Sequence, residues 1–454
     1  MKACIFITIF FLLWQTLPAS ATLSITEEKK LGERFFAEVK SQLPLIDDPI
    51  INNYINELGQ NLINQLPSRP FDYHFYVIDD STLNAFAGPG GYIFIYRGLF
   101  LIFENEDELA GVIAHECGHV ICRHIANRIE SSKKLNIATL LGILAGGILA
   151  RSPKATEAIA TTAIAAGMTL SLSYSREDEE QADRTGLRLV LGAGYDGRGT
   201  VTAFKKLARW GLESGGKIPP YLLTHPAISS RITYIEQALN SMSYNKRPRD
   251  QTRFKIAYAR LKAIYTDVDS AYSFFSASIR RNPNDFMNYY GLGLCASRKR
   301  SWQIALSNFK KALSLRPHEP LILRELGICH FYLNQFSLAI STLEKVPKDA
   351  ESLFYLGRAY QERGLIDKAI SSWKRCVRIN PSYSMGYYYL ARAYANLASS
   401  NNSNPERAWS HYYLGKYFRL EGKIPQADYH FKKALLLAKD KYLKDKLRRV
   451  LSER

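Results

Sequence analysis

The amino-acid sequence predicts a mainly α protein, in which an α+β domain with a small sheet precedes an α-solenoid. Two observations lead to this prediction. Short strand patterns interrupt the helical periodicity of the first half, and one set of leucine-glycine, alanine and proline positions recurs through the second half. A chain of 454 residues is also too long for one hydrophobic core. We therefore expect two domains, at residues 22–250 and 251–454, after a leader at residues 1–21.

The first 21 residues are typical of an export signal. Lys2 supplies a positive start, residues 5–13 form a short apolar run, and Ala19-Ser20-Ala21 offers small residues for cleavage near Ala21. An uncleaved anchor is the alternative, which the shortness of the apolar run disfavours. We therefore expect an exported, extracytoplasmic protein. The five cysteines beyond the leader are odd in number and widely spaced, so they do not form a disulfide scaffold.

The first domain is predicted to mix helices and short strands. Apolar residues with helical spacing cover residues 24–66, and residues 73–78 and 92–96 have the pattern of strands. Between the strands, residues 84–91 (Asn-Ala-Phe-Ala-Gly-Pro-Gly-Gly) predict a turn-rich loop. Asn105 is suited to cap a helix with Glu108 three residues on, and the apolar pattern continues past residue 121. This last helix carries the chemistry.

Two Ala- and Gly-rich apolar stretches, residues 135–150 and 155–172, predict a helical hairpin around an Arg-Ser-Pro-Lys turn. The first stretch covers about 24 Å as a helix, short of the roughly 30 Å of hydrocarbon in a bilayer. The second stretch contains Glu157 and several threonines. We expect a packed or membrane-grazing hairpin, with a membrane-spanning hairpin as the alternative.

The second half of the chain repeats. Leucine-glycine pairs at residues 292–293, 326–327, 356–357 and 414–415 mark clear copies, and a further copy starts at Leu390-Ala391 and runs into a polar stretch. The pattern resembles the tetratricopeptide repeat, whose paired helices need small residues where they approach each other and a proline to end the unit. Cys295 and Cys329 occupy equivalent places in successive copies, so we expect them to be packing residues.

The excess of positive charge lies in the second half of the chain. Residues 251–454 contain 35 basic and 16 acidic side chains, whereas the rest of the chain is nearly neutral. Basic repeats imply acidic partners, either protein segments or the phosphates of anionic envelope lipid in a peripheral membrane contact. A merely soluble basic surface is the alternative. Export excludes nucleic acid as the partner.

His115 and His119 form the first half of a metal site. They are four residues apart on the predicted helix, so both imidazoles lie on one face and can bind a single Zn²⁺. Glu116 then lies beside the metal, where its carboxylate accepts the proton of a water that attacks a peptide carbonyl. Cys117 is about 200° round the helix from each histidine, so it should face the core.

A catalytic zinc needs a third protein ligand and an open position for water. The acidic stretch at residues 175–183 predicts a second helix that supplies it. Glu179 and Asp183, one turn apart, give a ligand and an acceptor that orients the distal N–H of a histidine. If Glu179 is not the ligand, Glu177 and Glu180 are the next candidates. We expect one Zn²⁺ per chain.

These motifs resemble the gluzincin family of the CAAX prenyl endopeptidase. The resemblance rests on the histidine pair, the Ser-Arg-x-x-Glu-x-x-Ala-Asp pattern from Ser175, the loop at residues 84–91, Thr224-His225-Pro226 and Arg231-Ile232. It implies a zincin-like peptidase domain, with zinc ligands His115, His119 and Glu179, general base Glu116 and proton donor Asp183. For Asp183 we expect a ligand-orienting role instead, because a residue one turn behind a ligand points away from substrate.

The leader and the repeats make the chain similar to a periplasmic type within this family. That type is a peptidase and chaperone for outer-membrane protein assembly. The resemblance therefore implies a periplasmic location, unfolded or stalled envelope proteins as substrates, and an assembly machine as a partner of the repeats. A peptidase specific for prenylated proteins is disfavoured, since the chain lacks the several spanning helices that a lipid-buried site needs.

Two further features resemble parts of this family. Gly90 and Gly91, followed by a strand that begins with Tyr92 and Ile93, resemble the edge strand that pairs with an extended substrate backbone. An ordinary core strand is the alternative. His225 precedes a proline in a loop, where it either steadies the oxyanion, binds zinc as a removable fourth ligand, or is an ordinary surface residue.

Two hypotheses for function follow. The first is an extracytoplasmic zinc endopeptidase that cuts misfolded or stalled envelope proteins, with the repeats docking substrate or an assembly machine. The second is a repeat-scaffold chaperone or binding protein whose peptidase is normally shut. The complete set of ligands and base favours hydrolysis, because a scaffold has no use for Glu116.

Overall fold

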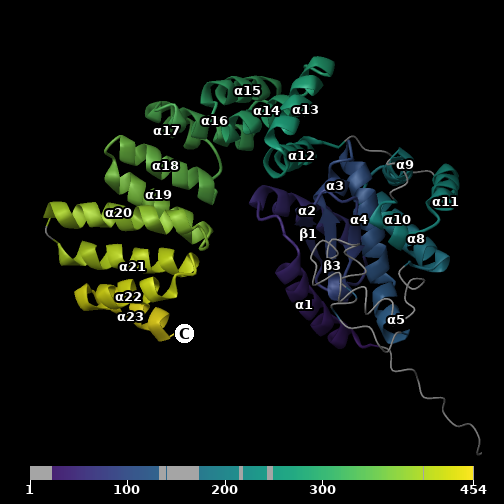
Figure 1. Ribbon diagram of the computed structural model, residues 1–454, viewed down its shortest axis with the longest axis horizontal. Coiled ribbons are helices and arrows are strands. Elements are labelled where there is room, and N and C mark those ends of the chain that lie inside the picture. The colour runs from purple at the N-terminus through teal and green to yellow at the C-terminus, as the bar shows by residue number, and fades with distance from the viewer. Residues whose placement is uncertain are drawn as a thin grey trace, which may run out of the picture. The chain divides into compact units, whose positions relative to one another are not determined.

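The computed structural model describes residues 23–131, 137, 140, 173–213, 218–242, 249–401 and 403–452 (Figure 1). It divides into two compact units, residues 1–265 and 266–454. The predicted leader and, apart from residues 137 and 140, the predicted hairpin lie outside the described residues. No helix in the described part of the chain is long and apolar enough to cross a membrane.

The first unit combines one small sheet with helices, as the sequence predicts. In chain order its elements are α1 (Ile25–Gln42), α2 (Pro49–Ile63), β1 (His74–Ile78), β2 (Ala85–Ala87), the 3₁₀ turn η1 (Pro89–Gly91), β3 (Tyr92–Tyr96), α3 (Arg97–Phe100), α4 (Glu106–Ile121), α5 (His124–Ser131), α8 (Arg176–Gly192), α9 (Arg198–Glu213), α10 (Pro220–Thr224), α11 (Ile228–Ser241) and α12 (Thr252–Tyr265).

The predicted helical stretch at residues 24–66 is confirmed as two helices. Ser24 caps α1 in a capping box with Glu27, and the Asp48 carboxylate caps α2 with Pro49 in its first turn. Each helix turns an apolar stripe inward. The residues between them, 43–48, leave helical geometry, so the periodicity breaks where the cap of α2 begins.

The sheet has the strand order β1-β3-β2, with β1 parallel and β2 antiparallel to β3. The two predicted strands are confirmed as β1 and β3. The loop prediction missed β2, because a segment of only three residues, two of them alanines, becomes a strand through pairing with β3. The prediction that β3 is an edge strand is wrong, since β3 is the central strand and pairs on both sides.

Gly90 and Gly91 also serve the chain's own packing. Both have positive φ, 73° and 98°. A Cβ on Gly91 would lie 2.6 Å from the carbonyl oxygen of Asp72, and one on Gly90 would lie 3.0 Å from that of Glu28. The backbone that approaches these glycines is therefore that of α1 and of the segment before β1.

Helix α12 packs in the first unit. Its Arg260 is buried and forms an ion pair of 2.8 Å with Asp48, the cap of α2. The Phe254 ring stacks on Phe100 with centroids 5.7 Å apart. The domain limits drawn from the sequence stay a prediction, and the structure adds that residues 252–265 pack with the first unit.

The second unit consists of helices alone. These are α13 (Val268–Arg281), α14 (Phe286–Arg298), α15 (Trp302–Leu315), α16 (Pro320–Tyr332), α17 (Phe336–Leu343), α18 (Ala350–Glu362), α19 (Ile366–Ile379), α20 (Ser384–Asn401), α21 (Asn404–Leu420), α22 (Ile424–Leu437) and α23 (Lys441–Ser452). Consecutive helices pack against each other in the described part of the unit, which confirms the predicted α-solenoid (Figure 1).

The recurring glycines lie where paired helices meet. A Cβ on Gly293 would lie 2.6 Å from the Phe309 ring, and one on Gly357 would lie 2.5 Å from the Trp373 ring. The repeat thus pairs a glycine of the first helix with a large side chain of the second. Cys295 and Cys329 are fully buried, which confirms their packing role.

The irregular copy at Leu390-Ala391 has its own architecture. Its first helix, α20, is followed by the long helix α21, which carries the next glycine, Gly415. A Cβ on Gly415 would lie 2.4 Å from the Phe431 ring of α22, so α21 acts as the first helix of the last pair. Helix α21 also packs on α20, where the Ser410 hydroxyl donates to the Ala391 carbonyl oxygen, so it contacts both the helix before it and the helix after it.

Candidate metal centre

Helix α4 carries the histidine pair through the middle of the first unit. The Asn105 side chain accepts a hydrogen bond from the Glu108 amide, as predicted, and the helix packs on β2 and β3. His115, Glu116 and His119 are all buried, at 1% exposure or less. Cys117 is also buried and belongs to the hydrophobic core, which confirms that it faces away from the metal site.

Glycines bring α4 and α8 into backbone contact. A Cβ on Gly118 of α4 would lie 2.4 Å from the carbonyl oxygen of Ala182, and one on Gly186 of α8 would lie 2.9 Å from that of Ala114. Only glycine permits this approach at both positions. The close crossing is what carries the acidic residues of α8 to the histidines of α4.

Helix α8 begins at the predicted acidic motif. Ser175 and Asp178 form a capping box, which sets the start of the helix one turn before Glu179. Glu179 and Asp183 are buried and point toward α4, whereas Glu177 is exposed and Glu180 pairs with Arg184 on the surface. Of the three candidate glutamates, only Glu179 lies among the histidines.

Four side chains converge on one point. His115 Nε2 lies 3.1 Å from His119 Nε2 and 3.3 Å from His225 Nδ1. The Glu179 carboxylate lies 3.4 Å from His119 Nε2, 3.6 Å from His115 Nε2 and 2.9 Å from His225 Nδ1. One ligand atom of each residue lies within 4.8 Å of all the others.

This donor set fits zinc. Tetrahedral zinc, with ligands at about 2.0–2.2 Å, places its ligand atoms roughly 3.3–3.6 Å apart, which is close to the spacing seen here. Burial lowers the pKa of His119 well below its ordinary value, so that imidazole is neutral. Burial opposes ionisation of Glu179, but the charges of His225 and Arg231 outweigh burial and hold its pKa far below the ordinary range. Neutral imidazole and ionised carboxylate are the forms that bind metal.

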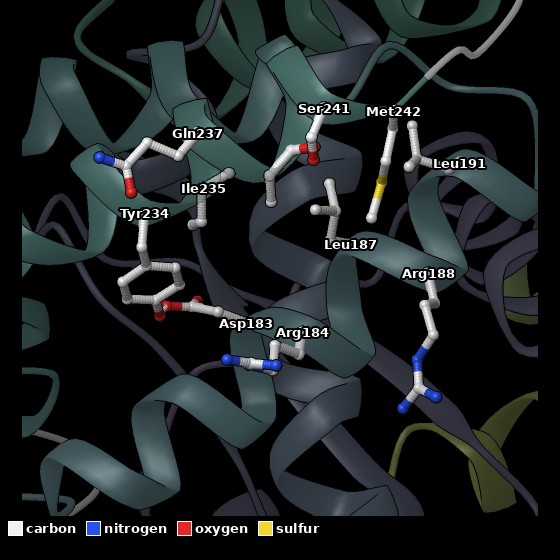
Figure 2. Close-up of a pocket in the computed structure, with 11 residues that line it drawn as sticks. Asp183, Arg184, Leu187, Arg188, Leu191, Tyr234, Ile235, Gln237, Ser241 and Met242 are labelled. Carbon is white, nitrogen blue, oxygen red and sulfur yellow. Dashed lines mark hydrogen bonds between the residues drawn. The ribbon is translucent and has the colours of Figure 1, made fainter.

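Arg231 holds the acidic side of the site together. It is buried, donates two hydrogen bonds of 2.7 Å to Asp183, and forms an ion pair with Glu179. Burial opposes ionisation of Asp183, but Arg231 and His115 hold its pKa far below the ordinary range. The Tyr234 hydroxyl also donates to Asp183, as the close-up shows (Figure 2). Arg231 is in the sequence motif, but neither helical spacing nor charge pattern indicated its role.

Asp183 contacts a ligand. Its Oδ1 lies 2.7 Å from His115 Nδ1, the ring nitrogen that is not directed at the other ligands. A carboxylate in this place fixes the tautomer and the orientation of the ring.

Glu116 has no hydrogen-bond partner among the described residues, although both of its carboxylate oxygens are buried. Its Oε1 lies 3.7 Å from His225 Nε2. Burial raises its pKa. A buried carboxylate next to a metal-ligand cluster, with both oxygens open to a new partner, is suited to accept a proton from water.

His225 lies in the link between α10 and α11. The next residues are Pro226 and Ala227, the latter with a φ of 60°, so the chain turns sharply here. The His225 ring stacks on Tyr221 with centroids 4.4 Å apart, and the ring of Tyr174 stacks on His119 at 3.8 Å. His225 is only 1% exposed, so it is not a surface histidine.

The sequence analysis missed His124 and Tyr174. His124 Nδ1 lies 2.9 Å from His119 Nδ1, and its other ring nitrogen lies 3.3 Å from the Gln181 amide oxygen. No spacing rule relates these residues to the histidine pair, because His124 follows a break in the helix. Their place beside His119 depends on the packing of α5 and α8.

A His-Glu-x-x-His pair on one helix, completed by a glutamate from a second helix, defines a zinc metallopeptidase of the gluzincin type. Residues 49–239 match the model of peptidase family M48. A tetratricopeptide repeat model matches residues 351–383. The expected class of enzyme and the repeats are thereby confirmed.

Several proteins are similar in sequence to this chain. The chain is 28% identical to the beta-barrel assembly-enhancing protease of Escherichia coli (strain K12) over 426 residues, which cover 90% of this chain and 84% of the relative. It is 35% identical to the protein of the same name from Yersinia pestis over 225 residues, 49% of this chain and 46% of the relative. It is also 35% identical to the mitochondrial metalloendopeptidase OMA1 of Arabidopsis thaliana over 162 residues, 36% of this chain and 30% of that protein.

Proposed function

We propose that the protein is an extracytoplasmic endopeptidase that binds one zinc ion through His115, His119 and Glu179 and hydrolyses peptide bonds of unfolded or stalled envelope proteins. The observation that carries the proposal is the convergence of four buried ligand atoms within 4.8 Å beside an unpartnered glutamate. Zinc in such a site lowers the pKa of a water and polarises a carbonyl.

Glu116 and Asp183 have different roles in the proposed reaction. Glu116 accepts the proton of the attacking water, because its carboxylate is buried, has a raised pKa and lacks another partner. Asp183 positions His115 through its Nδ1 and is itself held by Arg231. This arrangement supports a positioning role for Asp183, since three partners already occupy its carboxylate.

His225 acts as a removable gate. Its Nδ1 lies 3.3 Å from His115 Nε2 and 2.9 Å from the Glu179 carboxylate, distances similar to those among the three proposed ligands. The His225 ring therefore occupies the fourth position around the metal site, which a catalytic water would need. The ligands and Glu116 are almost completely buried, so a substrate reaches them only after a rearrangement. The link between α10 and α11 is the segment that would move, because it carries His225.

We assign β2, instead of β3, as the strand that pairs with the backbone of an extended substrate. In an antiparallel pair alternate residues direct their backbone groups to the partner. Two residues that flank β2 form backbone hydrogen bonds with β3. The Gly88 N–H donates to the Tyr92 carbonyl, and the Asn84 carbonyl accepts from the Tyr96 N–H. Ala85 and Ala87 therefore direct theirs away from β3, where an extended peptide can add. Both are buried, and the Tyr221 amide of α10 lies 3.4 Å from the Leu83 carbonyl. Movement of α10 would uncover this edge together with the ligands.

The cellular setting follows from the relatives and the leader. The Escherichia coli and Yersinia pestis relatives are named as proteases that enhance beta-barrel assembly. A chain with an export-type leader and similarity to these proteases suits the periplasm, with outer-membrane proteins as substrates and their assembly machinery as the partner of the repeats.

A second candidate function is a chaperone scaffold whose peptidase is normally shut. The burial of Glu116 and the place of His225 among the ligands favour it. One protein can act both as a peptidase and as a chaperone if the opening of the gate is regulated.

The substitution Glu116→Gln tests the enzymatic proposal. It removes the base but no ligand, so zinc content and fold should be retained while casein cleavage is lost by at least about a hundredfold. Zinc is measured by atomic absorption on the purified full-length chain. Cleavage at the wild-type rate would rule out Glu116 as the base.

A further inference from the structure

Arg358 and Arg392 of the repeat unit both lie near aromatic rings. In the described residues, no carboxylate lies within ion-pair distance of Arg358 in α18 or of Arg392 in α20. Both occur one residue after the small residue of the repeat, Gly357 and Ala391, so they are equivalent positions of successive copies. The solenoid therefore presents them on the same face, that of the first helices.

The two guanidinium groups lie near the same aromatic ring. The Arg358 guanidinium carbon is 5.2 Å from the centroid of the Tyr389 ring, and that of Arg392 is 5.6 Å from the same centroid. Arg358 also lies 4.4 Å from the centroid of the Phe331 ring in α16. Three successive first helices thus hold the pair, and the rings fix the orientation of the guanidinium planes.

A neighbouring arginine, Arg324, has its positive charge balanced by nearby glutamates. Arg324 in α16 is buried, and it forms ion pairs of 2.8 Å with Glu325 and 3.3 Å with Glu351. Arg358 is half-buried and Arg392 is exposed. Two like charges beside one ring repel each other, and an anion between them turns that repulsion into attraction.

An aromatic strip leads away from the pair. The Phe331 ring contacts Tyr355, the Tyr355 hydroxyl is 2.9 Å from that of Tyr332, and the Tyr332 ring stacks on Trp302 with centroids 4.0 Å apart. Tyr332 is 38% exposed. Exposed aromatic rings beside a cation pair suit a ligand that carries both carboxylates and apolar side chains.

We infer that Arg358 and Arg392 form a docking site for an acidic peptide segment, whose carboxylates bind the two guanidinium groups and whose neighbouring aromatic or apolar side chains pack on the strip. The excess of basic residues in this half of the chain would attract such a segment over longer range. The inference deepens the proposed function, since it rests on the repeats binding proteins and names the chemistry of the partner.

The test measures binding without hydrolysis. The probe is a fluorescein-labelled peptide that alternates glutamate and tyrosine, and fluorescence anisotropy follows its binding to full-length protein that carries Glu116→Gln. The double substitution Arg358→Gln and Arg392→Gln should weaken binding about tenfold or more. The matched control, Arg375→Gln with Arg378→Gln, removes two exposed arginines from the second helix α19 and should change binding less than about twofold.

Three further arms separate the outcomes. A peptide with glutamine in place of glutamate should bind weakly, and binding of the acidic peptide should fall between ~50 and ~300 mM NaCl. Phosphatidylglycerol vesicles that bind in place of the peptide, or equal effects of the two double substitutions, would overturn the inference. The binding assay uses a chain that cannot cleave, whereas casein cleavage by the chain with Glu116, Arg358 and Arg392 all intact tests the peptidase, so failure of this site and failure of the peptidase are distinguishable.

Discussion

Glu179 shows how one side chain among several similar ones comes to lie among the histidines. Three glutamates follow Ser175 within five residues, and only Glu179 is directed at α4. The others lie on the solvent side of the same helix turn, where Glu180 pairs with Arg184. Position on the helix, and not charge, therefore selects the ligand.

Replacement of Glu179 by glutamine should lower zinc affinity at least about tenfold and abolish most casein cleavage, because a neutral amide is a poor zinc ligand. Glu180→Gln is the matched control, since it makes the same chemical change one residue further on and leaves the site intact. Zinc affinity is measured by competition with a fluorescent chelator. Equal losses in both variants would place the third ligand elsewhere.

At the scale of elements, the contact between α4 and α8 determines the geometry of the site. Their backbones are in contact at Gly118 and at Gly186, where a Cβ would collide with the facing helix. The distance between Glu179 and the histidines therefore depends on glycine at both positions. A methyl group at either place would push the helices apart by some tenths of an ångström or more. Metal affinity and stability should therefore respond together.

Gly186→Ala should lower the free energy of unfolding by about 1–3 kcal/mol and weaken zinc binding, because its Cβ would lie 2.9 Å from the backbone of Ala114. Gly192→Ala, on the same helix, is the control. Its Cβ would meet only the flexible side chain of Gln65 at 3.3 Å, and the gain in helix propensity should leave stability equal or higher. Urea unfolding of both variants measures the difference, and equal stabilities would contradict this account of the helix contact.

The link between α10 and α11 controls access to the site in our proposal. His225→Ala should open the fourth position and raise casein cleavage severalfold, to the point of self-cleavage, with zinc retained by the other three ligands. If the imidazole instead steadies the oxyanion, the same change should reduce turnover about a hundredfold.

The His225 assay is run at matched zinc content, with His318→Ala as a control at an exposed loop histidine of the repeat unit. Activity within about twofold of wild type would reject the gate and the oxyanion role alike.

At the scale of the whole molecule, two units with separate cores share one chain. The metal ligands all belong to the first unit, and its four-residue cluster is the part of the described chain that gathers histidine and carboxylate groups at metal spacing. A ligand that binds only the folded form of one unit stabilises that unit.

Removal of zinc with EDTA should therefore raise amide hydrogen exchange in α4 and α8 while exchange in α14 to α19 is unchanged. Binding at a hundred to a thousand times Kd stabilises the folded form by about 3–4 kcal/mol, which is the protection that EDTA removes. The repeat helices act as the internal control in the same full-length sample. Equal changes in both units would show that they unfold as one.

Local patterns in the sequence determined much of this protein. The spacing of His115 and His119, the capping residues Ser175 and Asn105, and the recurring glycines act within one helix or one repeat, so they can be read without knowledge of the fold. These patterns predicted the repeats and the histidine pair of the metal centre, and apolar patterning predicted the two main strands.

Only the tertiary structure decided which strand is central and which distant side chains complete the site. Strand β2 exists because β3 lies beside it, and this pairing makes β3 an inner strand. Arg231 and His124 reach the site from separate helices, through packing that joins residues up to 116 positions apart in the chain. Such contacts depend on the way helices cross, which no local spacing encodes. For the same reason the sequence placed His225 in a loop but left its role open, and the fold put its ring among the ligands.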